Sequence, residues 1–295
     1  MSAVTATAVE QRPARLDAPH RRRAAVLSAL LLLAVVVAAL GLATGSSGLS
    51  WQSLRTDLAS AQAAVLFGEI RAPRTLGAWM VGALLGLAGA IAQGVFRNPL
   101  ADPFLLGCGA GASLAVVATI ALGSLAGWGV SLATAAWLER VGLVGAAFGG
   151  SLAGVALTLL LALGLAFALP AALALARVLD ALTLGEDSAA SLGLPVARLR
   201  LLLVALLAFA SGLAVAQAGL VAFVGLASPH LVRRLAPSSH AFLLAGSAAA
   251  GGLLLLAADV AARAIVAPEE LPVGVVTAVV GGGYLLVLLH RRVVL

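Results

Sequence analysis

Side chains able to carry out chemistry are few in this chain and are scattered along it. Among its 295 residues there are 12 acidic side chains, 4 histidines and 1 cysteine, Cys108. A catalytic centre or a metal site needs several such groups close together. The histidines instead fall at or beyond the ends of long apolar runs: His20, His230, His240 and His290. The pattern therefore predicts a protein that is not an enzyme, with no cofactor and no metal ligands.

All 18 basic side chains are arginines, and the sequence contains no lysine. A P-loop places a lysine on the phosphates of its nucleotide, so this chain cannot contain a standard one. A lysine Schiff base is excluded for the same reason. If ATP drives this protein, a separate chain must hydrolyse it.

The composition indicates which elements must hold these residues. Hydrophobic residues make up 62% of the chain, the mean hydropathy is +1.12 and only 10% of residues are charged. Several apolar runs reach about 20 residues, the length at which a helix spans a bilayer. We therefore expect an all-α polytopic membrane helical bundle, with a cytoplasmic polar tail over 1–23 and a membrane domain over 24–295. The net charge of +6 reflects arginines in loops and does not indicate nucleic-acid binding.

The apolar runs and the polar stretches between them predict about eight spans. They lie near 24–44, 75–95, 105–122, 141–178, 201–216, 219–232, 241–262 and 273–289. This arrangement of eight spans places 13 arginines on the side of the two termini and 5 on the other side. The positive-inside bias makes the side of the termini cytoplasmic. Five arginines oppose the bias: Arg55, Arg71, Arg74, Arg140 and Arg263.

Two local patterns indicate how the spans are joined and packed. The polar segment RNPLADP follows the second span, and a residue before proline avoids the helical region, so the segment predicts a turn. We interpret it as a structural loop formed by Arg97, Asn98, Pro99, Asp102 and Pro103, in which Asp102 could cap the next helix. Glycines four residues apart predict close helix packing at three places: Gly82/Gly86, Gly107/Gly111 and Gly145/Gly149.

Four long motifs occur in order along the chain. They are RAPRTLGAWMVGALLGLAGAIAQGVFRNPLADPFLLGCGAGASLA, LTLGEDSAASLGLPVARLR, AGLVAFVGLASPHLVRRL and AADVAARAIVAPEELPVGVVTAVVGGGYLLVLLHRR. Together they resemble the permeases of the vitamin B12, ferric-siderophore and haem ABC importers, over about residues 65–160 and 175–295. The resemblance implies a multi-pass permease of the bacterial inner membrane that imports a metal chelate. Haem is slightly favoured over a ferric siderophore or cobalamin.

The resemblance also implies partners. They are a second copy of the chain, two ATPase subunits on the cytoplasmic side, a periplasmic substrate-binding protein and membrane lipid, with no nucleic acid. In the family, arginines at the positions of Arg71, Arg74 and Arg263 receive acidic residues of the binding protein. The alternatives are an intrahelical ion pair between Asp259 and Arg263, or contacts with lipid headgroups.

The segment LTLGEDSAASLG resembles the coupling helix of the family, which docks in a groove of the ATPase. From the residues alone, Gly185 can end the preceding helix, and acidic residues after it favour a helix start. An ordinary loop is the alternative interpretation. The residues assigned to ATPase coupling are Leu184, Gly185, Glu186, Asp187, Leu192 and Gly193.

The chain departs from the family pattern in its middle. Family members resemble ten-helix proteins, and VGLVGAAFGGSLAGVALTLLL is similar to their fourth helix. It is followed almost directly by LGLAFALPAALALARVLDALTLGE, which is similar to the sixth. The fifth helix is missing, and its neighbours merge into one crossing, which accounts for eight spans. Because that region helps line the pathway in the family, we expect weak or absent transport by this form.

Without the resemblance, two other classes of function stay open. A secondary transporter of a small solute would need ionisable residues deep in the membrane, and Asp259 is the clearest one here. A membrane enzyme would need clustered acidic, histidine or cysteine side chains. His230 follows Pro229 at the cytoplasmic edge, and we interpret it as structural rather than as a haem ligand.

Overall fold

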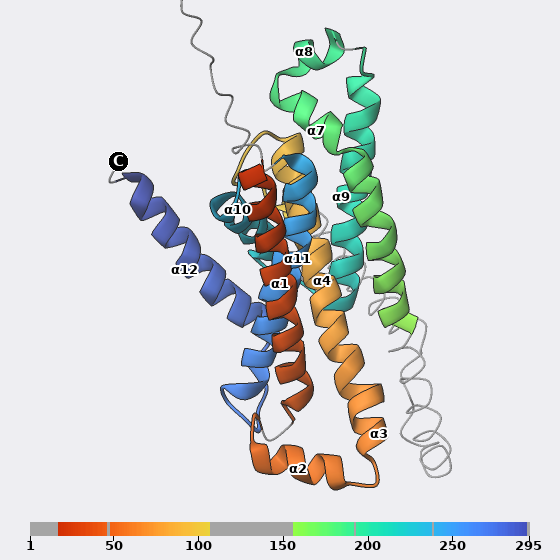
Figure 1. Cartoon of the computed structure of the whole chain (residues 1–295), viewed down its shortest axis with the longest axis vertical. Coiled ribbons are helices and arrows are strands. Elements are labelled where there is room, and N and C mark those ends of the chain that lie inside the picture. The colour runs from red at the N-terminus through yellow and green to blue at the C-terminus, as the bar shows by residue number, and fades with distance from the viewer. Residues whose placement is uncertain (1–16, 46–47, 107–155, 192, 238, 294–295) are drawn as a thin grey trace, which may run out of the picture.

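The computed structural model describes residues 17–45, 48–106, 156–191, 193–237 and 239–293. Within these ranges the secondary structure is helical, and the only extended pairing is an isolated bridge between Gly45 and Gly48. Figure 1 shows an elongated bundle with α2 (Trp51–Ala59) across one end and α8 (Glu186–Ser191) at the other. We call these the α2 end and the α8 end. The expected all-α membrane bundle is confirmed.

Two antiparallel helices form the centre of the bundle. α4 (Ala72–Val95) starts at the α2 end, and α11 (His240–Ala264) starts at the α8 end. Their small residues let the two backbones touch, since a Cβ at Gly86 would collide with the carbonyl oxygen of Ser247. The glycine pair that includes Gly82 is therefore a packing surface within the chain. The other two predicted pairs lie outside the described residues: Gly107/Gly111 and Gly145/Gly149.

The other helices surround this pair. α1 (Asp17–Ala43) packs against α11 and α4, while α9 (Val196–Ala218) packs against α4. A helix over Ala156–Ala174 lies beside α9, where Phe167 and Phe209 meet edge to face with ring centroids 5.6 Å apart. α12 (Val273–Val293) starts against the bundle and leans away from it toward its C-terminal end (Figure 1).

Five described helices are long and apolar enough to cross a membrane. They are Pro19–Ala43, Ala63–Val95, Ala156–Ala174, Val196–Ala218 and His240–Ala264. The second begins earlier than the expected 75–95, because α3 (Ala63–Val65) and the π-helical turn η1 (Leu66–Arg71) continue α4 backwards. In α12 the apolar part is shorter and covers Val273–Leu286. The expected span at 105–122 and the first part of 141–178 lie largely outside the described residues.

The expected span at 219–232 is wrong as a continuous helix. α10 covers only Val224–Leu235, which is too short to cross a bilayer, and residues 219–223 are not helical. Phe223 has φ +68, a left-handed conformation that a bulky residue adopts only where its surroundings hold it. Phe223 packs directly against the backbone of α12 at Gly281, where a Cβ would collide with the phenylalanine side chain. The chain therefore passes residues 219–223 without forming a helix, with left-handed backbone at both ends of the stretch, Gly219 and Phe223.

The start of α10 packs on α4 at Gly89, where a Cβ would collide with the carbonyl oxygen of Gly225. We expect Gly89→Ala to lower the free energy of unfolding by about 1–3 kcal/mol, the usual cost of overpacking. Gly77 on the same helix is the control, because a Cβ there meets nothing within 4 Å. Gly77→Ala should be neutral or stabilise by up to about 1 kcal/mol. Circular dichroism of thermal unfolding in detergent measures both, and equal midpoints would contradict this packing.

Candidate functional site

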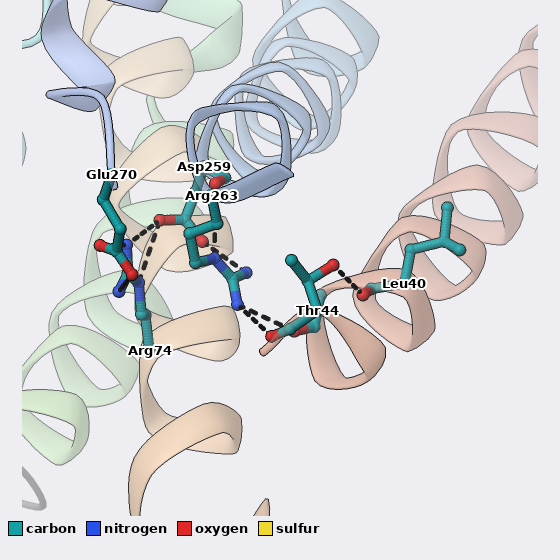
Figure 2. Close-up of polar contacts among 7 residues, drawn as sticks. Leu40, Thr44, Arg74, Asp259, Arg263 and Glu270 are labelled. Atoms are coloured by element: carbon teal, nitrogen blue, oxygen red, sulfur yellow. Dashed lines mark hydrogen bonds and ion pairs between the residues drawn. The ribbon is translucent and has the colours of Figure 1, made fainter. Parts of the chain in front are cut away.

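A buried ion pair lies at the α2 end of α11. Asp259 and Arg263 are one helical turn apart, and Asp259 Oδ2 lies 2.7 Å from Arg263 Nη2. Only 4% of the Arg263 side chain and 6% of the Asp259 side chain are exposed. Arg263 Nη1 also donates to the carbonyl oxygens of Gly41 and Thr44, at 3.0 and 3.2 Å (Figure 2). Arg263 thus satisfies carbonyls that the end of α1 leaves without helical partners.

Arg74 reaches the same carboxylate from the first turn of α4. Its Nε and Nη2 lie 3.2 and 3.1 Å from Asp259 Oδ1. Its outer edge faces Glu270, with Nη1 3.0 Å from Oε1 and Nη2 2.9 Å from Oε2 (Figure 2). The Arg74 side chain is 39% exposed and that of Glu270 is 46% exposed. We call Arg74, Asp259, Arg263 and Glu270 the α2-end network.

Glu270 lies in the loop between α11 and α12, and its charge state follows from Arg74. The hydrogen bond that Arg74 donates lowers the pKa of Glu270 below its ordinary value of 4.5, and burial opposes this shift. A carboxyl with a lowered pKa is charged at neutral pH. Its pairing with Arg74 is therefore fully present above pH 4.5 and is lost only as the pH falls through the lowered pKa.

Arg71 has a different set of partners. Its Nη2 lies 2.5 Å from Asp57 Oδ2, and its Nη1 donates to the carbonyl oxygen of Leu42 at 3.0 Å. Its guanidinium also lies over the ring of Phe67, 4.7 Å from the centroid. The side chain is buried, so Arg71 fastens α2 to the end of α1 and the start of α4.

The three arginines expected to face a binding protein are therefore not equivalent. Arg71 and Arg263 are buried and bound to groups of their own chain, whereas Arg74 is half-exposed. The intrahelical pair of Asp259 and Arg263, considered as an alternative to docking, is present. Arg263 shares Asp259 with Arg74, whereas Arg71 joins α2 to the end of α1. Docking of the binding protein on the three arginines stays a prediction.

The α8 end holds the segment expected to couple to an ATPase. α7 (Ala176–Thr183) ends just before Gly185, whose φ of +108 allows the chain to turn into α8. Leu184 is well exposed, and Glu186 accepts a hydrogen bond from Arg200 at 2.8 Å and lies 3.5 Å from Arg97. Asp187 is exposed, and Gly193 has φ +77. Leu192 lies outside the described residues.

The polar loop after α4 turns at Arg97, which has φ +50. Asn98 Oδ1 accepts a hydrogen bond from the backbone N–H of Leu100 at 2.9 Å. This bond closes a turn around Pro99, which lies between the two residues. Asp102 Oδ1 accepts from the N–H of Phe104 at 2.9 Å and so caps the short 3-10 helix η2 (Pro103–Leu106). Burial raises the pKa of Asp102, and this hydrogen bond opposes the shift.

Sequence reasoning missed two polar contacts near the α8 end. Asp180 Oδ1 lies 2.6 Å from His240 Nδ1 and also accepts the backbone N–H of His240, at 3.2 Å. This carboxylate therefore links α7 to the first residue of α11. Gln93, buried near the end of α4, donates to the carbonyl oxygen of Leu226 at 3.2 Å and accepts from Arg233. A glutamine within an apolar run was the available signal for the second contact.

The described residues contain no group of three or more histidine, cysteine, aspartate or glutamate side chains placed to hold a metal. His230 packs edge-on against Tyr284 of α12, with ring centroids 5.8 Å apart. The ion pairs described above lie at the two ends of the bundle, around α2 and around α8.

These features define an all-α polytopic membrane protein with charged networks at both ends of its central helices. The FecCD transport family matches residues 30–164 and 150–291. The chain belongs to this family, and the resemblance found in its motifs is confirmed.

Individual relatives agree with this assignment. The vitamin B12 import system permease protein BtuC of Salmonella paratyphi A is 35% identical over 312 residues, covering 89% of this chain and 94% of the relative. The protein of the same name from Pectobacterium atrosepticum is 35% identical over 324 residues, covering 92% and 94%. A solved structure of a metal-chelate type ABC transporter, in an inward-facing conformation, superposes with a TM-score of 0.69 at 27% identity. That alignment covers 91% of this chain and 99% of the other.

The comparisons also bear on the shortened middle. An alignment of 312 residues is longer than this chain, so the Salmonella relative carries positions that have no counterpart here. The two family matches overlap at 150–164, where the fourth and sixth helices are expected to join.

Proposed function

We propose that this chain is the transmembrane permease subunit of an ATP-binding-cassette importer that moves a metal chelate into the cytoplasm. The family match over residues 30–291 is the observation that carries the proposal. The names of the relatives favour cobalamin as cargo and give no support to the slight preference for haem. A ferric siderophore and haem remain the other candidates. A secondary transporter is disfavoured, because Asp259, its best coupling residue, is bound to two arginines at a helix end.

The proposed assembly contains two copies of the chain, two ATPase subunits and a substrate-binding protein, in the bacterial inner membrane. The α8 end is cytoplasmic, with both termini on that side, and the α2 end faces the binding protein. The arginine distribution supports this orientation. The absence of lysine supports a separate ATPase chain. The assembly is tested by purifying the tagged chain from native membranes; absence of any stoichiometric ATPase would contradict it.

The cargo is tested by uptake. A strain without its own importers, supplied with the permease, ATPase and binding protein, would be given radiolabelled cobalamin, haem and a ferric siderophore in turn. We expect cobalamin uptake to be weak, because the middle of the chain is short. A chimera that adds the segment of the Salmonella relative at 150–164 is the matched comparison and should transport faster. Vigorous uptake by the 295-residue form would show that the fifth helix is dispensable.

We propose that the segment around α8 transmits ATP hydrolysis to the permease. Replacing Glu186 and Leu192 with alanine should reduce coupled transport about tenfold, the effect of about 1.4 kcal/mol at a contact surface. Membrane insertion should be unchanged. Glu69 and Leu58 supply the control, since they are the same residue types, exposed at the opposite end. The measurement is cargo moved per ATP hydrolysed in proteoliposomes, and an unchanged ratio in the Glu186/Leu192 variant would count against this role.

We also propose that Arg74 receives an acidic side chain of the binding protein. It is the half-exposed member of the three expected arginines, and a planar guanidinium binds carboxylates in a bidentate way.

A further inference from the structure

Arg74 already holds a carboxylate in the geometry that an incoming partner would use. Its two terminal nitrogens face the two oxygens of Glu270, at 3.0 and 2.9 Å (Figure 2). This is the paired arrangement in which an arginine fork binds a single carboxylate. The position available to an acidic side chain of a partner is thus occupied by a residue of the same chain.

The two carboxylates on Arg74 differ in how easily they can leave. Asp259 is buried, belongs to α11 and also compensates Arg263, so its departure would leave a buried charge unpaired. Glu270 is 46% exposed and belongs to a loop, and exposed ion pairs of this kind are weak. Water or another carboxylate can replace it at low cost. Only the outer edge of Arg74 is therefore open to exchange.

We propose that Glu270 is an internal stand-in for the binding protein: it occupies Arg74 in the free permease and is displaced when a partner carboxylate docks. The inference rests on the docking role proposed above for Arg74. It adds that docking is an exchange of ligands on one guanidinium. The observed association constant for the binding protein is then the intrinsic constant multiplied by the fraction of time that Arg74 is free of Glu270.

The exchange also has a mechanical consequence. Glu270 lies three residues before Val273, the first residue of α12. Its loop is otherwise fastened by backbone hydrogen bonds, from Leu271 N–H to the Ala262 carbonyl at 3.1 Å and from Glu269 N–H to Val266 at 3.0 Å. Displacement of Glu270 removes the side-chain tie between this loop and α4. Docking therefore makes the loop before α12 more mobile, and α12 is the helix that leans away from the bundle (Figure 1).

Glu269 provides a matched control for the test. It is exposed, lies next to Glu270 in the same loop and carries the same charge, and it forms no ion pair within the described ranges. Glu269→Gln and Glu270→Gln change the local charge equally. A difference in behaviour between the two variants is therefore due to the contact of Glu270 with Arg74 and not to the loss of one negative charge from this loop.

The first measurement needs no partner. Hydrogen exchange of backbone amides over 266–272, in the purified permease–ATPase complex in nanodiscs, should be faster in Glu270→Gln than in wild type and unchanged in Glu269→Gln. Equal exchange in the two variants would show that Glu270 does not hold the loop, and it would overturn the inference whatever the binding protein does.

The second measurement titrates the importer's own soluble binding protein, loaded with cyanocobalamin, onto the same complexes at low salt. Glu270→Gln should bind about 3- to 6-fold tighter than wild type, and Glu269→Gln within about twofold, since only the first frees Arg74 from an exposed pair worth up to about 1 kcal/mol. The gain should vanish in an Arg74→Gln background, as a double-mutant cycle requires. A gain that persists there, or equal affinities of the two glutamine variants, would overturn the inference. Absence of binding to wild type would instead refute the docking role itself.

Discussion

Replacing Asp259 with alanine is expected to destabilise the bundle by about 3–5 kcal/mol, the cost of removing one partner of a buried ion pair. The reason is that Arg263 would keep its charge in a site with 4% exposure and lose its carboxylate at 2.7 Å. Its remaining contacts, to the backbone carbonyl oxygens of Gly41, Thr44 and residue 259 itself, carry no full charge. The measurement is loss of helical signal in an SDS titration of the protein in mixed micelles.

Two variants separate this effect from simpler ones. Asp259→Asn keeps an acceptor for Arg263 but loses the charge, so its stability should fall between those of wild type and Asp259→Ala. Glu270→Ala removes the exposed partner of Arg74, and exposed pairs contribute at most about 1 kcal/mol. If Asp259→Ala unfolded at the same SDS fraction as Glu270→Ala, the pair with Arg263 would not be stabilising the bundle.

Most of the long helices could be predicted from the sequence, because each is an apolar run of about one bilayer thickness with polar residues at its ends. The runs at 24–44, 201–216 and 241–262 correspond to α1, α9 and α11. The break over 219–223 could not be predicted in this way. Its residues, GLVAF, are even more apolar than α10, which contains a histidine and two arginines, so hydropathy predicts no interruption there. Tertiary contacts hold the break, and they come from helices distant in sequence.

The candidate site was predictable to the extent that it is local. Asp259 and Arg263 are four residues apart, so helical periodicity alone brings them together. Arg74 could be recognised from its motif and from its opposition to the positive-inside bias. Its partners could not be, because Asp259 and Glu270 lie 185 and 196 residues further along the chain. The burial that separates Arg71 and Arg263 from Arg74 likewise depends on where α1 ends and how α2 folds back.

Reversing the charge of Arg74 should have the largest effect on the partner. We expect Arg74→Glu to weaken capture of the binding protein about 100-fold at low salt, since losing a close interfacial charge pair costs about 2–5 kcal/mol and each 1.4 kcal/mol is tenfold. Arg74→Lys keeps the charge but loses the planar fork, so it should retain part of the affinity. Basal ATPase activity should persist in both variants, because Arg74 lies in the first turn of α4, which begins at the end of the bundle opposite α8 (Figure 1).

Arg55 is the matched control for this reversal. It is an exposed arginine of α2 at the same end of the bundle, and its guanidinium lies 5.1 Å from the ring centroid of Trp51, outside the α2-end network. Arg55→Glu changes the net charge of that end equally, so general attraction between an acidic partner and this surface would make the two variants alike. Surface plasmon resonance with immobilised permease–ATPase complex, at low and high salt, distinguishes the cases. The loss in Arg74→Glu should shrink as salt screens the contact. If the affinities of Arg74→Glu and Arg55→Glu agreed within threefold at both salt concentrations, Arg74 would not be part of the docking site. Equal losses would mean that the binding protein responds to the total charge of this surface and makes no specific contact with Arg74.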